Sequence, residues 1–151
     1  MRIYRYLSAT LFLLLGLGAA RATDLNVVLL DSATAHALRH KLVCILFPAG
    51  NPADPIVTES RQCQRTDSGG TATFKLPDPP PEKVDVELGS DGLVACYDPH
   101  TFTVADAMKV GMVAKNTCGD ANTDTTQTGE LVLFGHQMSV WEALKRWGDE
   151  F

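Results

Sequence analysis

The sequence predicts an all-β domain, a sandwich or barrel of about seven short strands with a short C-terminal helix. Residues 71–76 and 83–88 alternate apolar and polar side chains with a period of two, the pattern of a half-buried strand. Clusters of Gly, Pro, Asp and Ser separate these and the other β-rich runs at short intervals. We find no crossover helices, internal repeat or linker, so the 151 residues indicate one domain.

The expected strands follow from β-rich runs between breaks. They cover residues 25–30, 41–47, 56–65, 71–76, 83–88, 93–97 and 130–134. Thr66-Asp-Ser-Gly-Gly70 is a strong turn signal, and Ser68 is one of the residue types that form turns. Residues 119–129 form a polar loop.

Two helices are expected in the last third of the chain. One or two turns over residues 103–110 begin at Thr101 or Thr103 and stop at Gly111. The second helix covers residues 139–147. Ser139 caps it, Glu142 completes a capping box and Gly148 ends it.

The first 22 residues predict a secretory signal peptide. Arg2 and Arg5 precede an apolar run over residues 7–17, and an A-x-A cleavage site covers residues 20–22. The alternative is an uncleaved anchor, although the run is short for a bilayer. We therefore expect a β-sandwich over 23–138 and a C-terminal helix and tail over 139–151. The protein is expected in the periplasm or secreted, with no stable membrane span after cleavage.

Charge excludes some partners. Cleavage removes three arginines and no acid, which leaves 10 Lys and Arg against 18 Asp and Glu, a balance of −8 with His neutral. Nucleic-acid binding requires clustered cations, and anionic lipid surfaces also attract basic segments. Neither partner fits an acidic chain.

Four cysteines in an exported chain predict two disulfides. Cys44, Cys63, Cys96 and Cys118 allow three pairings. We favour Cys44–Cys63 and Cys96–Cys118, because each pair brackets a short excursion. A metal site is the weaker alternative, since the chain has no C-x-x-C and no His at finger-like spacing from a Cys pair. We expect no metal and no cofactor.

The C-terminal helix carries a stripe of large apolar residues. Trp141, Leu144 and Trp147 fall on one side at i, i+3 and i+6. The stripe either covers an open end of the domain's own core, which the pattern favours, or is exposed and binds a partner. Lys145 and Arg146 could help it lie on a membrane, but two charges are few for that.

Several segments resemble a known family. The opening Leu25-Asn-Val-Val-Leu-Leu-Asp31 is similar to a transthyretin-type domain, and residues 66–77 resemble the T-D-x-x-G-x-a-x-F-x-L-P signature of carboxypeptidase regulatory-like domains. Residues 110–119, 129–134 and 139–142 are similar to small exported bacterial proteins that carry this domain. The resemblance implies an antiparallel prealbumin/Ig-like β-sandwich that serves as an accessory or adhesive module.

Two activities of related folds lack their residues here. Hydroxyisourate hydrolases carry a His where this chain has Val28 and end in Tyr-Arg-Gly-Ser, whereas this sequence ends Asp149-Glu-Phe151. Isopeptide-forming pilin domains require an Asn on the last strand. Lys41 with Glu87 leaves that third partner unfilled.

The remaining polar candidates have simple structural explanations. His36 and His40 could share a helix face and bind a metal, but they lie between predicted strands in a solvated loop. His100 beside Asp98, and His136 beside the last strand, are expected at the surface or an edge. Ser68 is a turn former, with no G-x-S-x-G around it. Asp120 and Asp124 lack a calcium-loop pattern and are expected as unbound surface acids.

We therefore expect an exported, non-enzymatic module that binds a protein or cell-envelope partner, with Trp141, Leu144 and Trp147 as the candidate site. A carbohydrate or small-ligand site at one end of the sandwich is the alternative, favoured if Tyr97 or Phe102 lies in a hollow. An enzyme using His36, His40 or His100 requires two of them to meet a carboxylate.

Overall fold

The structure, a computed structural model, describes residues 23–49, 58–89 and 92–148. The signal peptide expected over 1–22 lies outside these residues. The described chain is all-β, with two short helices. Its strands are β1 (Thr23–Asp31), β2 (Leu42–Ala49), β3 (Thr58–Arg65), β4 (Thr71–Leu76), β5 (Lys83–Leu88), β6 (Leu93–Ala95), β7 (Tyr97–Asp98), β8 (Thr101–Thr103), β9 (Met112–Val113), β10 (Lys115–Asn116) and β11 (Glu130–Gln137). The helices are α1 (Val104–Val110) and α2 (Val140–Gly148).

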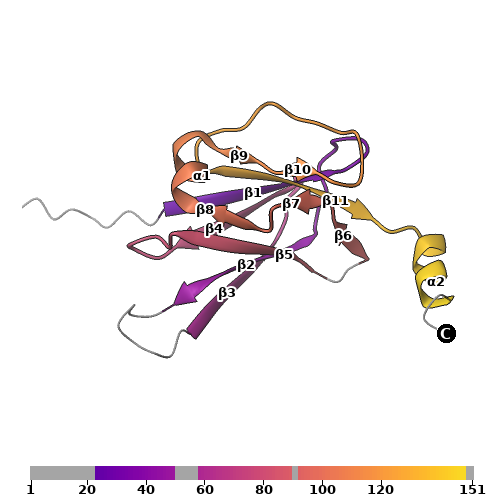
Figure 1. Cartoon of the computed structure of the whole chain (residues 1–151), viewed down its shortest axis with the longest axis horizontal. Helices are drawn as coiled ribbons and strands as arrows, with labels where there is room; N and C mark the ends of the chain where they lie inside the picture. Colours follow the sequence, from indigo (N-terminus) through magenta and orange to yellow (C-terminus); the bar gives the residue numbers. More distant parts are fainter. Residues whose placement is uncertain (1–22, 50–57, 90–91, 149–151) are drawn as a thin grey trace, which may run out of the picture.

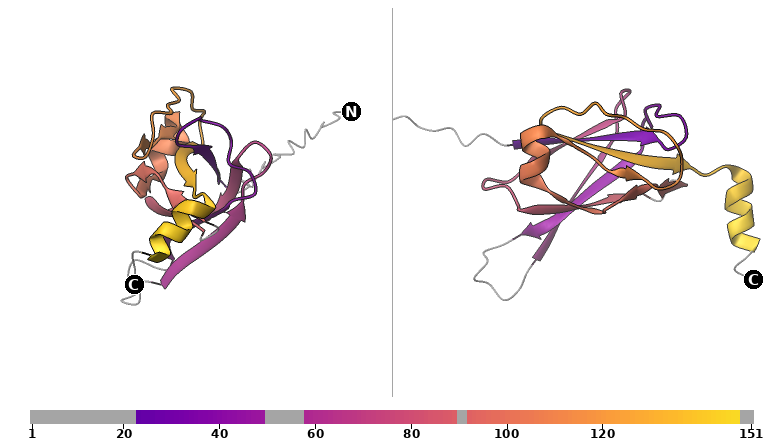
Figure 2. Two further views of the ribbon diagram at one scale, coloured as in Figure 1. Left: turned by 90° about the vertical axis from the view of Figure 1, so that its right-hand side faces the viewer. Right: turned by 45° about the horizontal axis from the view of Figure 1, so that its top comes forward.

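Two sheets lie on either side of the core (Figures 1 and 2). The first has the order β4-β1-β11-β6, and β9 also pairs with β11. The second has the order β3-β2-β5-β8, and β7 and β10 form a separate small ladder. Most pairs are antiparallel, as expected. β11 differs, because it pairs in parallel with β1, from Asn26 opposite Glu130 to Asp31 opposite Gly135, and also with the short strand β9. A parallel pair needs a long connection, and the strands between β1 and β11 supply it.

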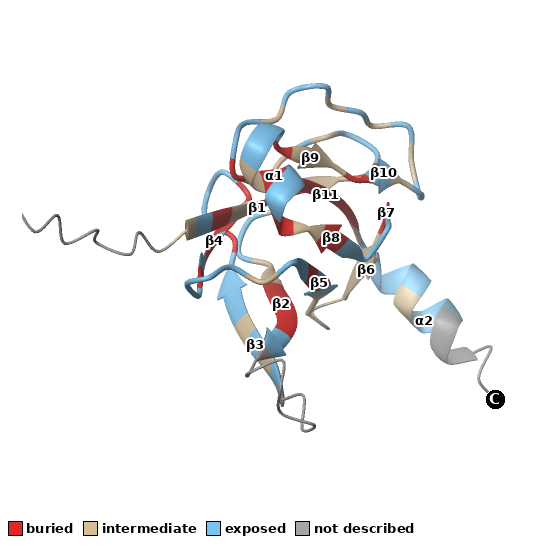
Figure 3. Ribbon diagram, turned by 60° about the vertical axis from the view of Figure 1, so that its left-hand side comes forward, coloured by how far each residue is buried: buried red, intermediate tan, exposed pale blue. Residues whose placement is uncertain are grey.

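One hydrophobic cluster joins the two sheets (Figure 3). It is formed by inward-facing residues of both sheets, so each strand contributes alternate positions. The largest fully buried side chains are Phe74, Phe102, Phe134, Leu25, Leu29, Ile45, Leu131 and Leu133. In β4 and β5 the buried positions are those that the period-two pattern predicts. The pattern therefore identified the inner faces correctly.

The predicted strands are observed with shifted ends, and three short strands were missed. β8, β9 and β10 have only two or three residues each, too few for a recognisable period. The run expected over 93–97 is divided into β6 and β7. Cys96 lies between them, fully buried, and its N–H donates to the Phe134 carbonyl.

The turn between β3 and β4 follows from three of its residues. The hydroxyl of buried Thr66 donates to the Leu38 carbonyl at 2.6 Å and accepts the Lys41 N–H. The Asp67 carboxylate accepts the N–H groups of Gly69 and Thr71 at 2.8 and 3.0 Å. Gly70 has φ of +78°, and a Cβ there would lie 2.8 Å from the Leu29 carbonyl oxygen. The turn thus fixes β4 against β1.

Both disulfides have the favoured pairing. Cys44 and Cys63 are directly opposite on β2 and β3. Cys96 joins Cys118 and ties the segment after β10 to the end of β6. Each closes a loop of 19 or 22 residues, for which chain entropy gives about 3 kcal/mol of stability. Neither of the two described helices has the length and apolar character that a membrane crossing requires.

We expect Gly70→Ala to destabilise the fold by about 1–3 kcal/mol, because it places a side chain at positive φ and against the Leu29 carbonyl. Urea denaturation of the disulfide-bonded protein measures it. Gly69→Ala is the matched control, since its Cβ would meet only the Asp67 side chain at 3.3 Å. Equal losses in the two variants would contradict the assigned role of Gly70.

Candidate functional site

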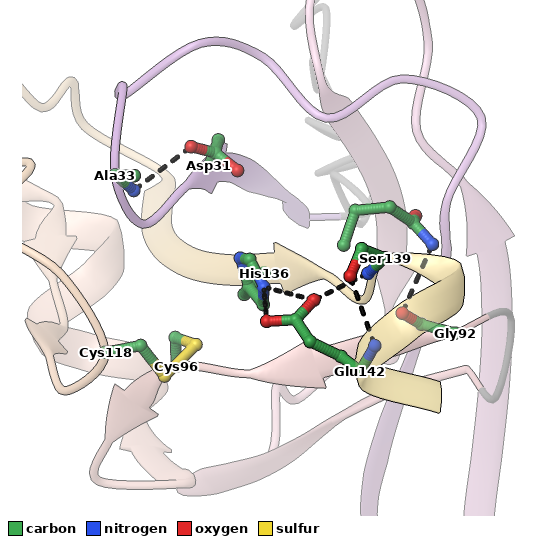
Figure 4. Close-up of polar contacts among 9 residues, drawn as sticks. Asp31, Ala33, Gly92, Cys96, Cys118, His136, Ser139 and Glu142 are labelled. Atoms are coloured by element: carbon green, nitrogen blue, oxygen red, sulfur yellow. Dashed lines mark hydrogen bonds and ion pairs between the residues drawn. A yellow bond between two sulfur atoms is a disulfide. The ribbon is translucent and has the colours of Figure 1, made fainter. Parts of the chain in front are cut away.

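The end of β11 is bonded to its surroundings before α2 begins (Figure 4). The Gln137 side chain donates to the Gly92 carbonyl at 3.2 Å and accepts a hydrogen bond from the Lys41 ammonium. The Met138 N–H donates to the same Gly92 carbonyl at 2.8 Å. Gln137, the last residue of β11, and Met138, the residue after it, therefore both bond to Gly92, which directly precedes β6. These contacts fix the direction in which the chain leaves the sheet.

The predicted capping box begins α2. The Ser139 N–H donates to Glu142 Oε2 at 2.6 Å, and the Glu142 N–H donates to Ser139 Oγ at 3.2 Å. The Glu142 carboxylate also contacts His136, with Nε2 at 3.2 and 3.3 Å from its two oxygens. Figure 4 shows this carboxylate between Ser139 and the His136 ring. One side chain thus caps the helix and joins it to the last strand.

These contacts stabilise the charged form of Glu142. The backbone hydrogen bond from Ser139, then its side chain and then His136, lower the pKa of Glu142. The contact between His136 and Glu142 is half-exposed, so by itself it contributes little stability. It places the Glu142 side of α2 toward β11.

This orientation turns the apolar side of α2 away from the domain. Glu142 is two residues from both Val140 and Leu144, which places it about 160° from each around the helix axis. Because Glu142 faces β11, Val140 and Leu144 face outward, and Trp141 lies beside them. We call these three residues the apolar face of α2. Figures 1 and 2 show the helix extending beyond the two sheets.

The exposed fractions agree with this orientation. Val140 is 76% exposed, Trp141 81% and Leu144 57%. The interpretation that the stripe covers an open end of the core is therefore wrong for Trp141 and Leu144. Sequence periodicity shows that a helix has an apolar side, but the side that meets the domain depends here on Glu142 and His136. The Trp147 side chain lies outside the described part of the structure.

The other candidate residues do not form a site. His36 and His40 are exposed in the loop after β1, and His100 contacts the Tyr97 ring edge-on at 4.9 Å. Among the described residues, no hydrogen bond or ion pair joins these three imidazoles to one another or to a carboxylate. Lys41 bonds to Gln137, and Glu87 pairs with Arg61 at 3.1 Å, so the lysine and acid considered for a cross-link have other partners.

The acids of the polar loop and Ser68 of the tight turn lie at the surface. Asp120 and Asp124 are exposed, and no three potential ligands among His, Cys, Asp and Glu gather anywhere in the described ranges. Ser68 lies at the exposed tip of the β3–β4 turn. Phe102 is part of the core.

Tyr97 lies in the wall of a hollow, as the small-ligand alternative requires. The hollow measures about 520 Å³ and lies where β5 passes Tyr97, His100 and Thr101. The Tyr97 hydroxyl donates to the Val86 carbonyl at 2.9 Å, and burial, followed by the charge of Glu87, raises the pKa of Tyr97. Only 2% of Tyr97 is exposed, so its ring offers no face on which a sugar could stack. The hollow therefore does not favour the carbohydrate alternative.

His136 is the residue that sequence reasoning missed. It was expected at the surface or at an edge, and its exposure is intermediate. Its contact with Glu142 depends on the bend at Met138, which returns the first turn of α2 toward β11. The capping box was the one sequence signal that could have indicated this contact. The Glu142 carboxylate in such a box can accept a second hydrogen bond besides the one from the Ser139 N–H.

No family model, no curated protein and no solved structure matches this chain.

We expect Ser139→Ala to loosen α2 by about 1 kcal/mol, because two capping hydrogen bonds depend on residue 139 and its hydroxyl accepts one of them. Hydrogen exchange of the Ala143 amide should become about fivefold faster, while amides in the middle of β11 stay unchanged. Ser139→Thr is the control, since it keeps the hydroxyl. Unchanged exchange at Ala143 in the alanine variant would contradict the capping role of Ser139.

We expect α2 to lose order in acid. A carboxylate with a lowered pKa stabilises the fold above its unfolded value, here 4.5, and this contribution is lost as the pH falls through the lowered pKa. Both tryptophans of the chain lie on α2, so their fluorescence anisotropy reports its motion. It should be constant above about pH 5 and fall below it.

Glu142→Gln separates this transition from other acid effects. Hydrogen bonds from Thr71 and Gly69 also lower the pKa of Asp67, so the main fold responds to acid as well. The glutamine variant should lack the pH-dependent change in anisotropy that precedes global unfolding. The same transition in both proteins would assign it to another group.

Proposed function

We propose that this protein is an exported, non-enzymatic module that binds a protein or cell-envelope partner through the apolar face of α2. One observation carries the proposal. The polar side of α2 is bonded to the end of β11, and Val140, Trp141 and Leu144 are exposed on the other side.

The exposure has a thermodynamic meaning. Burial of apolar surface stabilises by about 25 cal/mol per Å², and aromatic side chains offer 150–250 Å² each. Scattered single apolar residues are ordinary on protein surfaces, whereas a contiguous apolar group on a fixed element marks an interaction site. Tryptophan is also the residue type in which binding energy most often concentrates. A partner that covers Trp141 would recover stabilisation that the domain leaves unused.

The proposal also includes the fold family of the domain. We propose a prealbumin-like sandwich of the carboxypeptidase regulatory-like type, a class of accessory modules. The roles of Thr66, Asp67 and Gly70 in the β3–β4 turn support it, because they give physical reasons for three positions of the family signature. The two sheets about one core support it as well.

Export is supported by two kinds of observation. The sequence of residues 1–22 has the layout of a signal peptide. All four cysteines form disulfides, which indicates an oxidising, extracellular type of environment. Paired cysteines also leave no thiol that could act as a nucleophile.

Photo-crosslinking in the cells that produce the protein tests the function. A benzoylphenylalanine at position 141 should give a discrete adduct with a partner. Position 110 is the matched control, because Val110 is also apolar and 63% exposed but lies on α1. Figure 1 shows α1 at the opposite end of the domain from α2. Adducts of equal yield from both positions would contradict the proposal, as would no adduct from either position together with no binding of α2 to lipid vesicles.

A further inference from the structure

The apolar face of α2 is a ridge with a defined shape. The nine residues of the helix span about 13 Å at 1.5 Å per residue. Val140 and Leu144 are four residues apart and lie in one column, with Trp141 next to it. A convex row of apolar side chains at this spacing is what a hydrophobic groove accepts when one protein binds a helix of another.

The ridge is formed before any partner arrives. The capping box holds the first turn, and the contacts of Gln137 and Met138 with Gly92 hold the chain that leads to it. Binding therefore does not have to order the helix. Preformed elements bind more tightly for the same contacts, because less conformational entropy is lost.

An exposed ammonium group lies beside the ridge. Lys145 is four residues after Trp141, so it lies on the same edge of the helix, and it is exposed. Glu142, the acid nearest to it in the helix, is bonded to Ser139 and His136 instead. Within the described ranges Lys145 has no ion pair. A partner that covers Trp141 would bring its own carboxylate to this ammonium group.

Two other occupants fit less well. A lipid surface needs more than one weak anchor for stable attachment, and the balance of −8 expected after cleavage of residues 1–22 opposes anionic lipids. On the described surface of a second copy of this chain, the hollow lined by Leu46, Phe47 and Pro48 also has Glu59, Lys83 and Asp85 in its wall, and Leu46 and Phe47 are only 9% and 5% exposed. Outside α2 its one large exposed apolar residue there is Val110, which stands alone.

We propose that the occupant is a protein with an apolar groove that takes the apolar face of α2, with an acidic side chain on the groove wall beside Lys145. This inference rests on the proposed function and specifies the partner. It predicts that contact extends across the whole ridge and depends on the sign of the charge at position 145.

Photo-crosslinking of the full chain in producing cells tests the groove. Benzoylphenylalanine at positions 140, 141 and 144 should give adducts of one mass with the same protein, identified by mass spectrometry. In the position-141 protein, Lys145→Glu should lower the adduct yield about tenfold, and Lys145→Arg should preserve it. Circular dichroism of both variants checks that α2 still forms.

A second measurement identifies the competing occupants. Purified full chain is mixed with phosphatidylcholine vesicles, with and without phosphatidylglycerol, and the tryptophan emission is recorded. We expect no blue shift. A blue shift without a protein adduct would assign the face to lipid, and an adduct of twice the chain mass would assign it to a second copy; both overturn the groove and leave the proposed function standing.

Two further outcomes are decisive. A protein adduct that Lys145→Glu does not weaken would overturn the inference, because the acidic wall is part of it. The absence of any adduct together with unchanged emission on vesicles would remove both the inference and the proposed function.

Discussion

The parallel pairing of β1 with β11 is the constraint on which the arrangement depends. It places the first and last strands at the centre of one sheet, where both are covered by β4 on one side and by β6 and β9 on the other. β11 has eight residues, and its five buried positions end at Gly135. The strand then continues past the core to His136 and Gln137. α2 follows a central, buried strand closely in the chain, so the position of β11 determines where α2 lies.

A central strand is a stable base for a surface element. Loops move because few contacts hold them, whereas residues at the end of a core strand share its rigidity. His136 lies opposite Val94 and Gln137 opposite Leu93 in the sheet register, so both side chains that orient the helix stand on paired backbone. The domain can thus present an apolar group to solvent without letting it fold back onto the core.

Local sequence patterns predicted the strands and helices, whereas tertiary contacts determined how these elements are paired and oriented. Period-two alternation identified the inner faces of β4 and β5, and the capping box at Ser139 and Glu142 located the start of α2 within one residue. The segment from Thr66 to Gly70 was also predicted as a turn from its composition. The parallel β1–β11 pair was not, because strand direction in a sheet depends on topology rather than composition. The outward apolar face was missed for a related reason, since it depends on one contact between His136 and Glu142.

The order of the disulfides has a consequence for how the chain matures. The first cysteine pairs with the second and the third with the fourth, without nesting or crossing. In a chain that crosses a membrane with its N-terminus leading, as proposed, each cysteine meets its native partner before the next pair emerges. An oxidase that joins cysteines in their order of appearance makes the native bonds directly. Biogenesis of this protein then requires an oxidant but no disulfide isomerase, and shuffling, which is slow, is avoided.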